Sequence, residues 1–458
     1  PESYHYRNWN NGIIKGTLRL PDGKILAYGN AGVWQTDSCF ITFTDFNQGL
    51  VRGIDNRKIS NIIRLANNDI WCAGLYSVYL LDKNKWQEYP ISGNEERISD
   101  ITQHGDTLVV LTRSNLYASV SPYHKFRKIE LKAPENYSPK ISLFRTIWLL
   151  HSGELFGTPG KLVVDFLGVV LIILSITGII YTFLPSFIRR RHRKRLPVKT
   201  QAKALKTSLN WHNKLGTWLI VLTILLSVTG MCLRPPLMIP FVLVNTNPIP
   251  GTTLDSDNPW HDKLRSIRWD ASKNVWLLSS STGFYLINDF TLPPVKLKRT
   301  PPVSPMGVNV FYPKNPDEWL IGSFSGLFIW NPSTGSVLDY YTGHPPAATY
   351  GRPLGGSLVN GFTNDLITRE VIFEYDNGAR NKENNLALPA MPVFMQQQPM
   401  SLWSFCLELH VGRCYSPFLG VFSDLFVFIS GLLLTLILIS GYIVYKRHHK
   451  RSKKIRMH

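Results

Sequence analysis

The sequence predicts a membrane-bound bundle of α-helices combined with an all-β domain outside the membrane. Three observations support this: three long apolar segments, two basic clusters beside them, and short strand-like segments that recur with a similar cadence. At 458 residues the chain is long enough for two or three domains.

Each apolar segment is long enough to cross a bilayer, which takes about 20 residues. They are Leu162 to Phe187, Leu215 to Leu233, and Leu425 to Tyr445. A buried helix of a soluble protein can be equally apolar, but these three adjoin the basic clusters, and basic loops stay cytoplasmic. We therefore expect the first and third segments to run inward and the second outward.

The net charge of +19 is concentrated in those two clusters. Nine Lys and Arg lie between Arg189 and Lys206, and seven more follow Tyr445. The rest of the chain is nearly balanced, which argues against a uniformly basic nucleic-acid binder. His192, His448 and His449 lie inside these basic runs, where a solvated role facing lipid headgroups outweighs metal ligation.

These signals predict a domain organisation with both β-rich parts outside a cytoplasmic membrane. The expected parts are a β half (1–140), a Leu-His-x-Gly segment with an inward helix (141–188), a basic cytoplasmic loop (189–210), an outward helix (211–234), a second β half with a linker (235–400), a second Leu-His-x-Gly segment with an inward helix (401–446), and a basic cytoplasmic tail (447–458).

Five segments of the β-rich parts share one pattern: a polar turn, a strand, a small polar turn and a second strand. They are GKILAYGNAGVW from Gly23, NDIWCAGLYSVYLLD from Asn68, DTLVVLTRSNLY from Asp106, NVWLLSSSTGFYLIND from Asn274, and DEWLIGSFSGLFIW from Asp317. Their spacing of about 40 residues matches one propeller blade per repeat and favours a composite β-propeller built from both halves. A β-sandwich, whose strands need no fixed period, is the alternative. Residues 377–400 are predicted to form a linker or extended arm.

The five cysteines are scattered at Cys39, Cys72, Cys232, Cys406 and Cys414. The absence of a Cys-x-x-Cys pair excludes a thioredoxin-type motif and covalent c-type haem attachment. Buried free thiols and one or two disulfides both remain open.

A duplicated histidine motif is the most specific feature. SLFRTIWLLHSGELFG, from Ser142, is repeated about 260 residues later as SLWSFCLELHVGRCYS, from Ser401. His151 and His410 occupy the same place in the two copies, and Asp165 and Asp424 follow 14 residues after them. A single hydrogen-bonded histidine gives no reason for such a repeat, which predicts equivalent places in a pseudo-symmetric bundle.

His212 begins the outward segment, with Gly216 one helical turn further on the same face. That pair would offer a ligand atom and a gap for a flat macrocycle, whereas the alternative is an interfacial histidine beside Trp211. Small residues in Ser175-Ile-Thr-Gly178, Ser227-Val-Thr-Gly230 and Ser440-Gly441 would let helices or a cofactor approach closely. Imidazole pairs across a bundle are a common way to hold haem iron.

Asp165 and Asp424 are secondary site candidates. They could handle protons or substrate, but we expect them to favour the positive N-terminal ends of the inward helices.

Leu149 to Tyr181, Trp211 to Gly230 and the second Leu-His-x-Gly with its helix resemble the PepSY-associated transmembrane helix family, which includes the inner-membrane ferric-siderophore reductases of Gram-negative bacteria. In this sequence, propeller-like segments replace the PepSY modules of the family. The resemblance implies that His151, His212 and His410 are ligands of haem iron, in two haem b groups.

The resemblance also implies a function: a haem-dependent ferric-chelate reductase of the inner membrane, passing electrons to a ferric siderophore or other iron chelate in the periplasm. The expected partners are the lipid bilayer and an iron chelate or an iron-uptake protein of the periplasm or outer membrane, with no nucleic acid. The alternative is a non-enzymatic envelope sensor or scaffold whose β domain binds other proteins.

The duplication carries one further expectation. The second unit has an outward helix with a histidine, β segments, then Leu-His-x-Gly and an inward helix, whereas the first unit shows only the last three parts. We expect a fourth helix before Pro1, outward-running and opening with His-x-x-x-Gly, whose histidine would partner His212.

Overall fold

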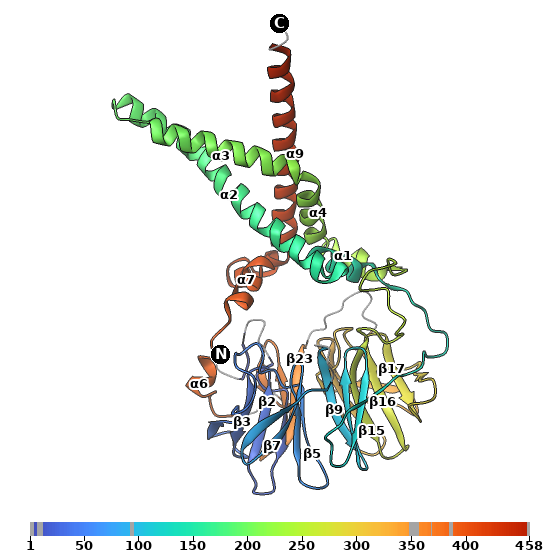
Figure 1. Ribbon diagram of the computed structural model, residues 1–458. Coiled ribbons are helices and arrows are strands. Elements are labelled where there is room, and N and C mark those ends of the chain that lie inside the picture. Colours follow the sequence, from blue (N-terminus) through green and yellow to red (C-terminus); the bar gives the residue numbers. More distant parts are fainter. Residues whose placement is uncertain are drawn as a thin grey trace. The chain divides into compact units, whose positions relative to one another are not determined.

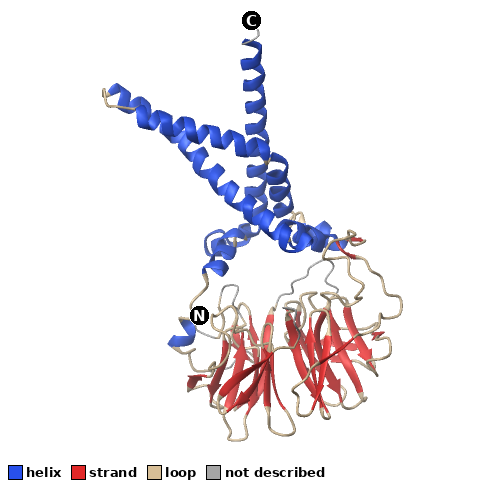
Figure 2. Cartoon of the chain, in the orientation of Figure 1, coloured by secondary structure: helices blue, strands red, loops and turns tan. Residues whose placement is uncertain are grey.

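The computed structural model describes residues 4–6, 12–91, 96–347, 357–367, 369–383 and 388–455. The chain forms two compact units, which we call the β unit (Pro1–Ser138 and Asp257–Glu408) and the helical unit (Pro139–Ser256 and Leu409–His458). Nearly all strands belong to the first and the long helices to the second (Figure 2). Each unit is therefore built from two separate stretches of chain.

The first half of the β unit contains three antiparallel four-stranded sheets, each ordered as its strands follow in the chain (Figure 1). Their strands are β1 (Gly16–Arg19), β2 (Ile25–Gly29), β3 (Gly32–Thr36) and β4 (Phe43–Asp45); β5 (Asn61–Arg64), β6 (Ile70–Ala73), β7 (Val78–Asp82) and β8 (Lys85–Tyr89); β9 (Ile98–His104), β10 (Thr107–Thr112), β11 (Leu116–Val120) and β12 (Arg127–Ile129).

The second half repeats the arrangement with two four-stranded sheets and one three-stranded sheet. Their strands are β15 (Leu264–Asp270), β16 (Val275–Ser280), β17 (Gly283–Ile287) and β18 (Val295–Lys296); β19 (Val310–Pro313), β20 (Trp319–Ser323), β21 (Gly326–Asn331) and β22 (Ser336–Asp339); β23 (Val359–Leu366), β24 (Arg369–Glu374) and β25 (Gly378–Arg380). The five segments singled out in the sequence are the central hairpins of the first five sheets.

Hydrophobic clusters join each sheet to its neighbours. Ile25 and Ala27 of β2 pack with Val371 and Phe373 of β24, so the first sheet also meets the last. The other clusters link successive sheets in chain order, including the third to the fourth, which come from different halves. Burial of the two halves against each other therefore stabilises them as one unit.

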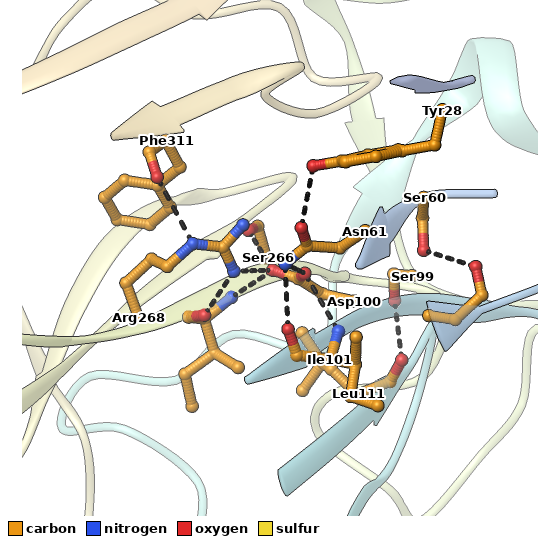
Figure 3. Close-up of polar contacts among 12 residues, drawn as sticks. Tyr28, Ser60, Asn61, Ser99, Asp100, Ile101, Leu111, Ser266, Arg268 and Phe311 are labelled. Atoms are coloured by element: carbon orange, nitrogen blue, oxygen red, sulfur yellow. Dashed lines mark hydrogen bonds and ion pairs between the residues drawn. The ribbon is translucent and has the colours of Figure 1, made fainter. Parts of the chain in front are cut away.

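Asp100, in β9, is the centre of a buried polar network and is only 2% exposed (Figure 3). Its Oδ1 accepts a hydrogen bond from Nδ2 of Asn61 at 3.2 Å, and its Oδ2 accepts one from the backbone N–H of Ile267 at 3.0 Å. The hydroxyl of Ser266 and the guanidinium of Arg268 also donate to Oδ2. A buried carboxylate with this many donors is fully satisfied, which indicates a structural role.

The same network extends to further sheets on both sides. Tyr28, in β2, donates its hydroxyl hydrogen to Oδ1 of Asn61 at 2.9 Å. On the other side, Nε of Arg268 donates to the backbone carbonyl of Phe311, in β19, at 3.2 Å. Five successive sheets are thus joined by polar contacts near their first strands (Figure 3).

The helical elements follow the duplicated sequence. They are α1 (Leu143–Ser152), η1 (Glu154–Phe156), α2 (Gly157–Arg193), α3 (Lys199–Trp218), α4 (Ile220–Met231) and α5 (Met238–Leu243), then α6 (Val393–Gln396), α7 (Leu402–His410), η2 (Arg413–Tyr415), α8 (Ser416–Leu419), η3 (Gly420–Phe422) and α9 (Ser423–Ile455). Strands β13 (Ile141–Ser142) and β14 (Asn245–Thr246) pair beside α1 and α5.

Two helical stretches, Glu154–Arg193 and Leu425–His448, are long and apolar enough to cross a membrane. The expected continuous helix at 211–234 is instead bent by 71° between α3 and α4, and the pair qualifies as a third span only when taken together. Because both halves of the β unit pack together, they lie on one side of the membrane. A crossing by α2 therefore requires a return crossing through α3 and α4.

Other expected boundaries also shift. Residues 235–256 belong to the helical unit rather than to the second β half. The predicted linker at 377–400 begins with β25, the last strand of the sixth sheet, and residues 384–387 lie outside the described part. All five cysteines are free thiols, which decides against disulfides within the described chain.

Candidate functional site

Both copies of the Leu-His-x-Gly motif have the same backbone. In each, a helix ends at the motif, the glycine adopts a left-handed conformation (Gly153 φ 78°, Gly412 φ 81°), and a 3₁₀ turn leads towards a long helix. A left-handed residue after a helix favours glycine, which explains the glycine of the motif. It does not explain the histidine.

His151 lies at the end of α1 and is held by α4. Its Nδ1 is 3.1 Å from the carbonyl oxygen of Leu226 and 3.1 Å from Oγ1 of Thr229. The Thr229 hydroxyl donates to the carbonyl of Leu225 at 2.8 Å, so its oxygen can only accept from the ring. Two acceptors at Nδ1 place the proton there and leave the lone pair on Nε2.

His212, in α3, repeats this arrangement against α2. Its Nδ1 is 2.9 Å from Oγ1 of Thr177, whose hydroxyl donates to the carbonyl of Ile173 at 2.7 Å. The proton therefore lies on Nδ1 and the lone pair on Nε2. Fixing a histidine through its other nitrogen is how proteins orient metal-ligating imidazoles.

A glycine follows each of these threonines and lies against the same ring. A Cβ at Gly230 would come within 2.9 Å of Cε1 of His151, and one at Gly178 within 3.6 Å of Cε1 of His212. The repeated Ser-x-Thr-Gly sequence was predicted only to allow close approach. Its specific function here, a threonine on Nδ1 and a glycine beside the ring, needed the structure.

The ring centroids of His151 and His410 lie 6.1 Å apart, and the two ring planes are inclined by 23°. This gap is too wide for direct stacking, for which His104 and Trp269 give a centroid distance of 3.5 Å in the same chain. Neither ring nitrogen of His410 has a hydrogen-bond partner among the described residues.

That spacing fits one metal ion between two imidazoles. With metal–nitrogen bonds of about 2 Å, two imidazoles on opposite sides of an ion have centroids roughly 6 Å apart. No group of three or more His, Cys, Asp or Glu side chains that could hold a metal occurs in the described ranges.

The two histidine sites lie at different positions along α2. Gly160 lies against Gly153, two residues from His151, whereas Thr177 holds His212. The 17 residues between Gly160 and Thr177 correspond to about 25 Å of helix. The structure thus brings His151 and His410 together and keeps His212 apart.

The secondary candidates have different outcomes. Asp165 is an exposed residue in the third turn of α2, whose first turn contains no acid, so the expected position at a helix N-terminus is wrong. Asp424 is the second residue of α9, as expected, and its side chain is outside the described part. A Cβ at Gly216 would make ordinary contact with Leu174, at 3.6 Å, so this glycine faces α2 as His212 does.

Ser440 and Gly441 contact no second helix: Ser440 donates to the carbonyl of Ile437, and no described atom lies within 4 Å of a Cβ built at Gly441. Ser227 instead joins α4 to α9, donating to the carbonyl of Gly431 at 3.0 Å. Ser227 therefore helps to pack α4 against α9, as Thr177 helps to pack α2 against α3.

A family model described as the PepSY-associated TM region matches residues 82–448, most of the chain. The chain belongs to this family. The family resemblance expected from the sequence is thereby confirmed, and the protein is a membrane protein that combines spanning helices with a β-rich region.

Comparison with curated proteins gives no match. Among solved structures, the extracellular domain of a hybrid two-component system, BT4673 of B. thetaiotaomicron, matches at 9% identity with a TM-score of 0.37, covering 82% of this chain and 33% of that chain. An ancestral GH74 enzyme matches at 9% identity with a TM-score of 0.34, covering 83% and 39%. The chain thus spans well under half the length of these structures, and likenesses this distant carry no argument about function.

Proposed function

We propose that this PepSY-associated membrane protein binds haem b through its histidines and passes electrons across the membrane to an iron chelate on the outer side. The observation that carries the proposal is the pair of imidazoles of His151 and His410, whose centroid separation suits one metal ion between their nitrogens. Bound haem supplies a one-electron carrier that no amino-acid side chain in the site provides.

In this proposal each residue of the site has a defined task. His151 offers Nε2 as a ligand because Leu226 and Thr229 hold its Nδ1. His410, with no described hydrogen-bond partner, offers the opposing ligand. His212 serves the second position along α2, where Thr177 holds its Nδ1.

The proposal also covers the architecture of the β unit and the side of the membrane on which it lies. We infer that its six sheets are the blades of one composite propeller, supported by the packing of the last sheet on the first and by the polar contacts that join five of them. The basic ends of α2 and α9 favour the cytoplasm and so support our inference that the β unit lies in the periplasm of a Gram-negative bacterium. There it would dock an iron chelate or an iron-uptake protein.

Reduction would release iron because chelators that suit hard Fe(III) hold the softer Fe(II) less well. One electron, supplied by a reductant on the cytoplasmic side or in the membrane, converts one chelated Fe(III) to Fe(II), with no bond formed to the protein.

The visible spectrum of the purified full chain tests the proposal. We expect Soret and α bands that change reversibly with dithionite, with less bound haem in His151→Ala and His410→Ala. His192→Ala is the matched control, because His192 is exposed within a basic run. A colourless native protein, or equal haem in all three variants, would contradict the proposal and favour a sensor or scaffold without a cofactor.

A further inference from the structure

One side of α3 carries a row of exposed lysines. Residues four and seven positions apart lie on one side of a helix, and the row follows this spacing: Lys199, Lys203 and Lys206. The opposite side of α3 packs on α2 (Figure 1). There the hydroxyl of Ser208 donates to the carbonyl of Thr177 at 3.5 Å, and His212 contacts the side chain of the same threonine. The three lysines, which we call the lysine row, therefore face away from α2.

The stretch of chain that carries the lysine row has no acidic residue. The sequence contains no Asp or Glu between Asp165 and Asp255, and none after Asp424. The last turns of α2 add two exposed arginines, Arg189 and Arg190, at the same end of the helix pair. Within the described residues, no ion pair includes a member of the lysine row. A basic surface of this kind attracts an anionic partner from outside the chain.

The surface beside the lysine row is apolar. Because α2 and α3 run antiparallel, Lys206, two residues before Ser208, lies close in level to Ile179, two residues after Thr177. Ile176 and Ile179 are both more than half exposed, as expected for side chains that face acyl chains. With 37 residues, α2 is about 55 Å long, whereas the hydrocarbon core is about 30 Å thick. The lysine row thus lies where the apolar run of α2 gives way to its arginines.

The rest of α3 also has the character of a helix at a membrane surface. Nζ of Lys214 is 5.8 Å from the ring centroid of Trp211 and 5.6 Å from that of Trp218, and both tryptophans are exposed. Lysines on one face with tryptophans beside them are typical of helices at the boundary between headgroups and acyl chains. A bend of 71° at Leu219 separates α3 from α4, which has no charged residue.

We propose that the lysine row binds the headgroups of anionic phospholipids, in the leaflet that the basic end of α2 reaches. Each ammonium group offers three donors to phosphate oxygens. The acyl chains of the same lipids cover the exposed isoleucines of α2, which neither a free phosphate nor an acidic soluble protein would do. Basic residues next to a membrane span attract anionic lipids in this way. The site goes beyond the proposed function, because it does not depend on haem.

Binding of labelled lipids to the full chain in an uncharged detergent tests the site. The probes are dansyl-labelled phosphatidylglycerol and phosphatidylcholine with the same acyl chains, which differ in net charge. We expect phosphatidylglycerol to bind at least tenfold more tightly, with a preference that falls as salt is raised, because salt screens the attraction. Inorganic phosphate should compete no better than chloride at the same ionic strength.

Two outcomes of this measurement would overturn the proposal. Equal binding of the two lipids would leave the lysine row as a docking surface for an acidic protein. Displacement of phosphatidylglycerol by inorganic phosphate, but not by chloride, would assign the row to a soluble phosphate instead.

Variants of the full chain locate the site. The triple variant Lys199→Gln, Lys203→Gln, Lys206→Gln should bind phosphatidylglycerol at least tenfold more weakly. The corresponding triple variant with Arg keeps the charge and should keep the binding. Because the lysine row is exposed and faces away from α2, both variants should keep the fold.

The matched control removes the same charge from exposed lysines of the β unit: Lys24→Gln, Lys85→Gln, Lys128→Gln. It should bind phosphatidylglycerol as the native chain does. Equal affinity in this control and in the Gln variant of the lysine row would overturn the proposal. Haem content measured on the same samples separates this result from the proposed function.

Discussion

Polar groups are buried in both units, but they are satisfied to different degrees. In the β unit, both oxygens of Asp100 accept several hydrogen bonds. In the helical unit, His151 and His212 are held through Nδ1 alone, and Nε2 has no hydrogen-bond partner in the described chain. A buried polar group whose hydrogen bonds are all made stabilises the fold. A histidine that is oriented through one nitrogen and has a lone pair left on the other is prepared to bind a ligand.

The largest effect is expected when the hydrogen-bond network of Asp100 is broken. Asp100→Ala should lower the free energy of unfolding of the β unit by about 3–5 kcal/mol, because Arg268 would keep its buried charge without its partner. Urea unfolding followed by tryptophan fluorescence measures it. Asp106→Asn, at the exposed turn between β9 and β10, should change stability by less than about 0.5 kcal/mol. Equal midpoints for the two variants would show that the network is not structural.

A second prediction concerns the two histidines that are held through Nδ1. Thr229→Val removes one of the two acceptors at Nδ1 of His151, and Thr177→Val removes the acceptor at Nδ1 of His212. Each should weaken haem binding about 10–100-fold at the histidine it holds, with the larger loss at His212. Haem titration of the apoprotein measures this. Thr223→Val is the control, because the Thr223 hydroxyl bonds only to the carbonyls of its own helix. If all three variants bind haem alike, the threonines do not position ligands.

Substitutions of the two glycines should have different effects, whereas the two threonine substitutions should both weaken haem binding. Gly230→Ala places a Cβ 2.9 Å from Cε1 of His151 and should displace the ring, costing about 1–3 kcal/mol in folding or in haem binding. Gly178→Ala meets His212 at 3.6 Å, an ordinary contact, and should be nearly neutral. An equal loss of stability or haem affinity in both variants would contradict the difference expected from the two Cβ–ring distances.

The smallest effect is a pH dependence in the β unit. Lys15 and Lys58 have pKa values of about 8, below the ordinary 10.5, with Arg97 and Asp55 as the charged groups facing them. Between pH 8 and 10.5 the unfolded chain binds more protons, so stability should rise with pH. Urea unfolding at pH 7 and 9.5 measures this trend, and a lower stability at pH 9.5 than at pH 7 would contradict it.

The features that depend on local sequence were predictable, whereas those that depend on contacts between distant segments were not. The central hairpins of five sheets follow from alternating strands and small turns, and the family from the two Leu-His-x-Gly copies. The sixth sheet was less evident because β23 carries polar residues such as Asn360 and Asp365. The bend at Leu219 escaped notice because Leu215 to Leu233 is apolar on both sides of it.

The histidines themselves were found from the sequence, but their partners were not. Thr229 is separated from His151 by 78 residues, and no periodicity links residues across that distance. Asp165 was misplaced because α2 begins at Gly157, before its apolar run becomes recognisable.

The division of the β unit into two stretches has a consequence for how the protein is made. Val109 and Leu111 pack with Leu264 and Ile267, and Ile25 and Ala27 with Val371 and Phe373. When the first three sheets emerge during synthesis, Ile25 and Ala27 have no partner until Val371 has been made, whereas Val109 and Leu111 wait for residues 139–256. At about 5–20 residues per second that delay is on the order of ten seconds. Membrane insertion of α2 to α4 thus occurs between the two halves of one folding event, and a chain that stalls there exposes surfaces suited to capture by a chaperone.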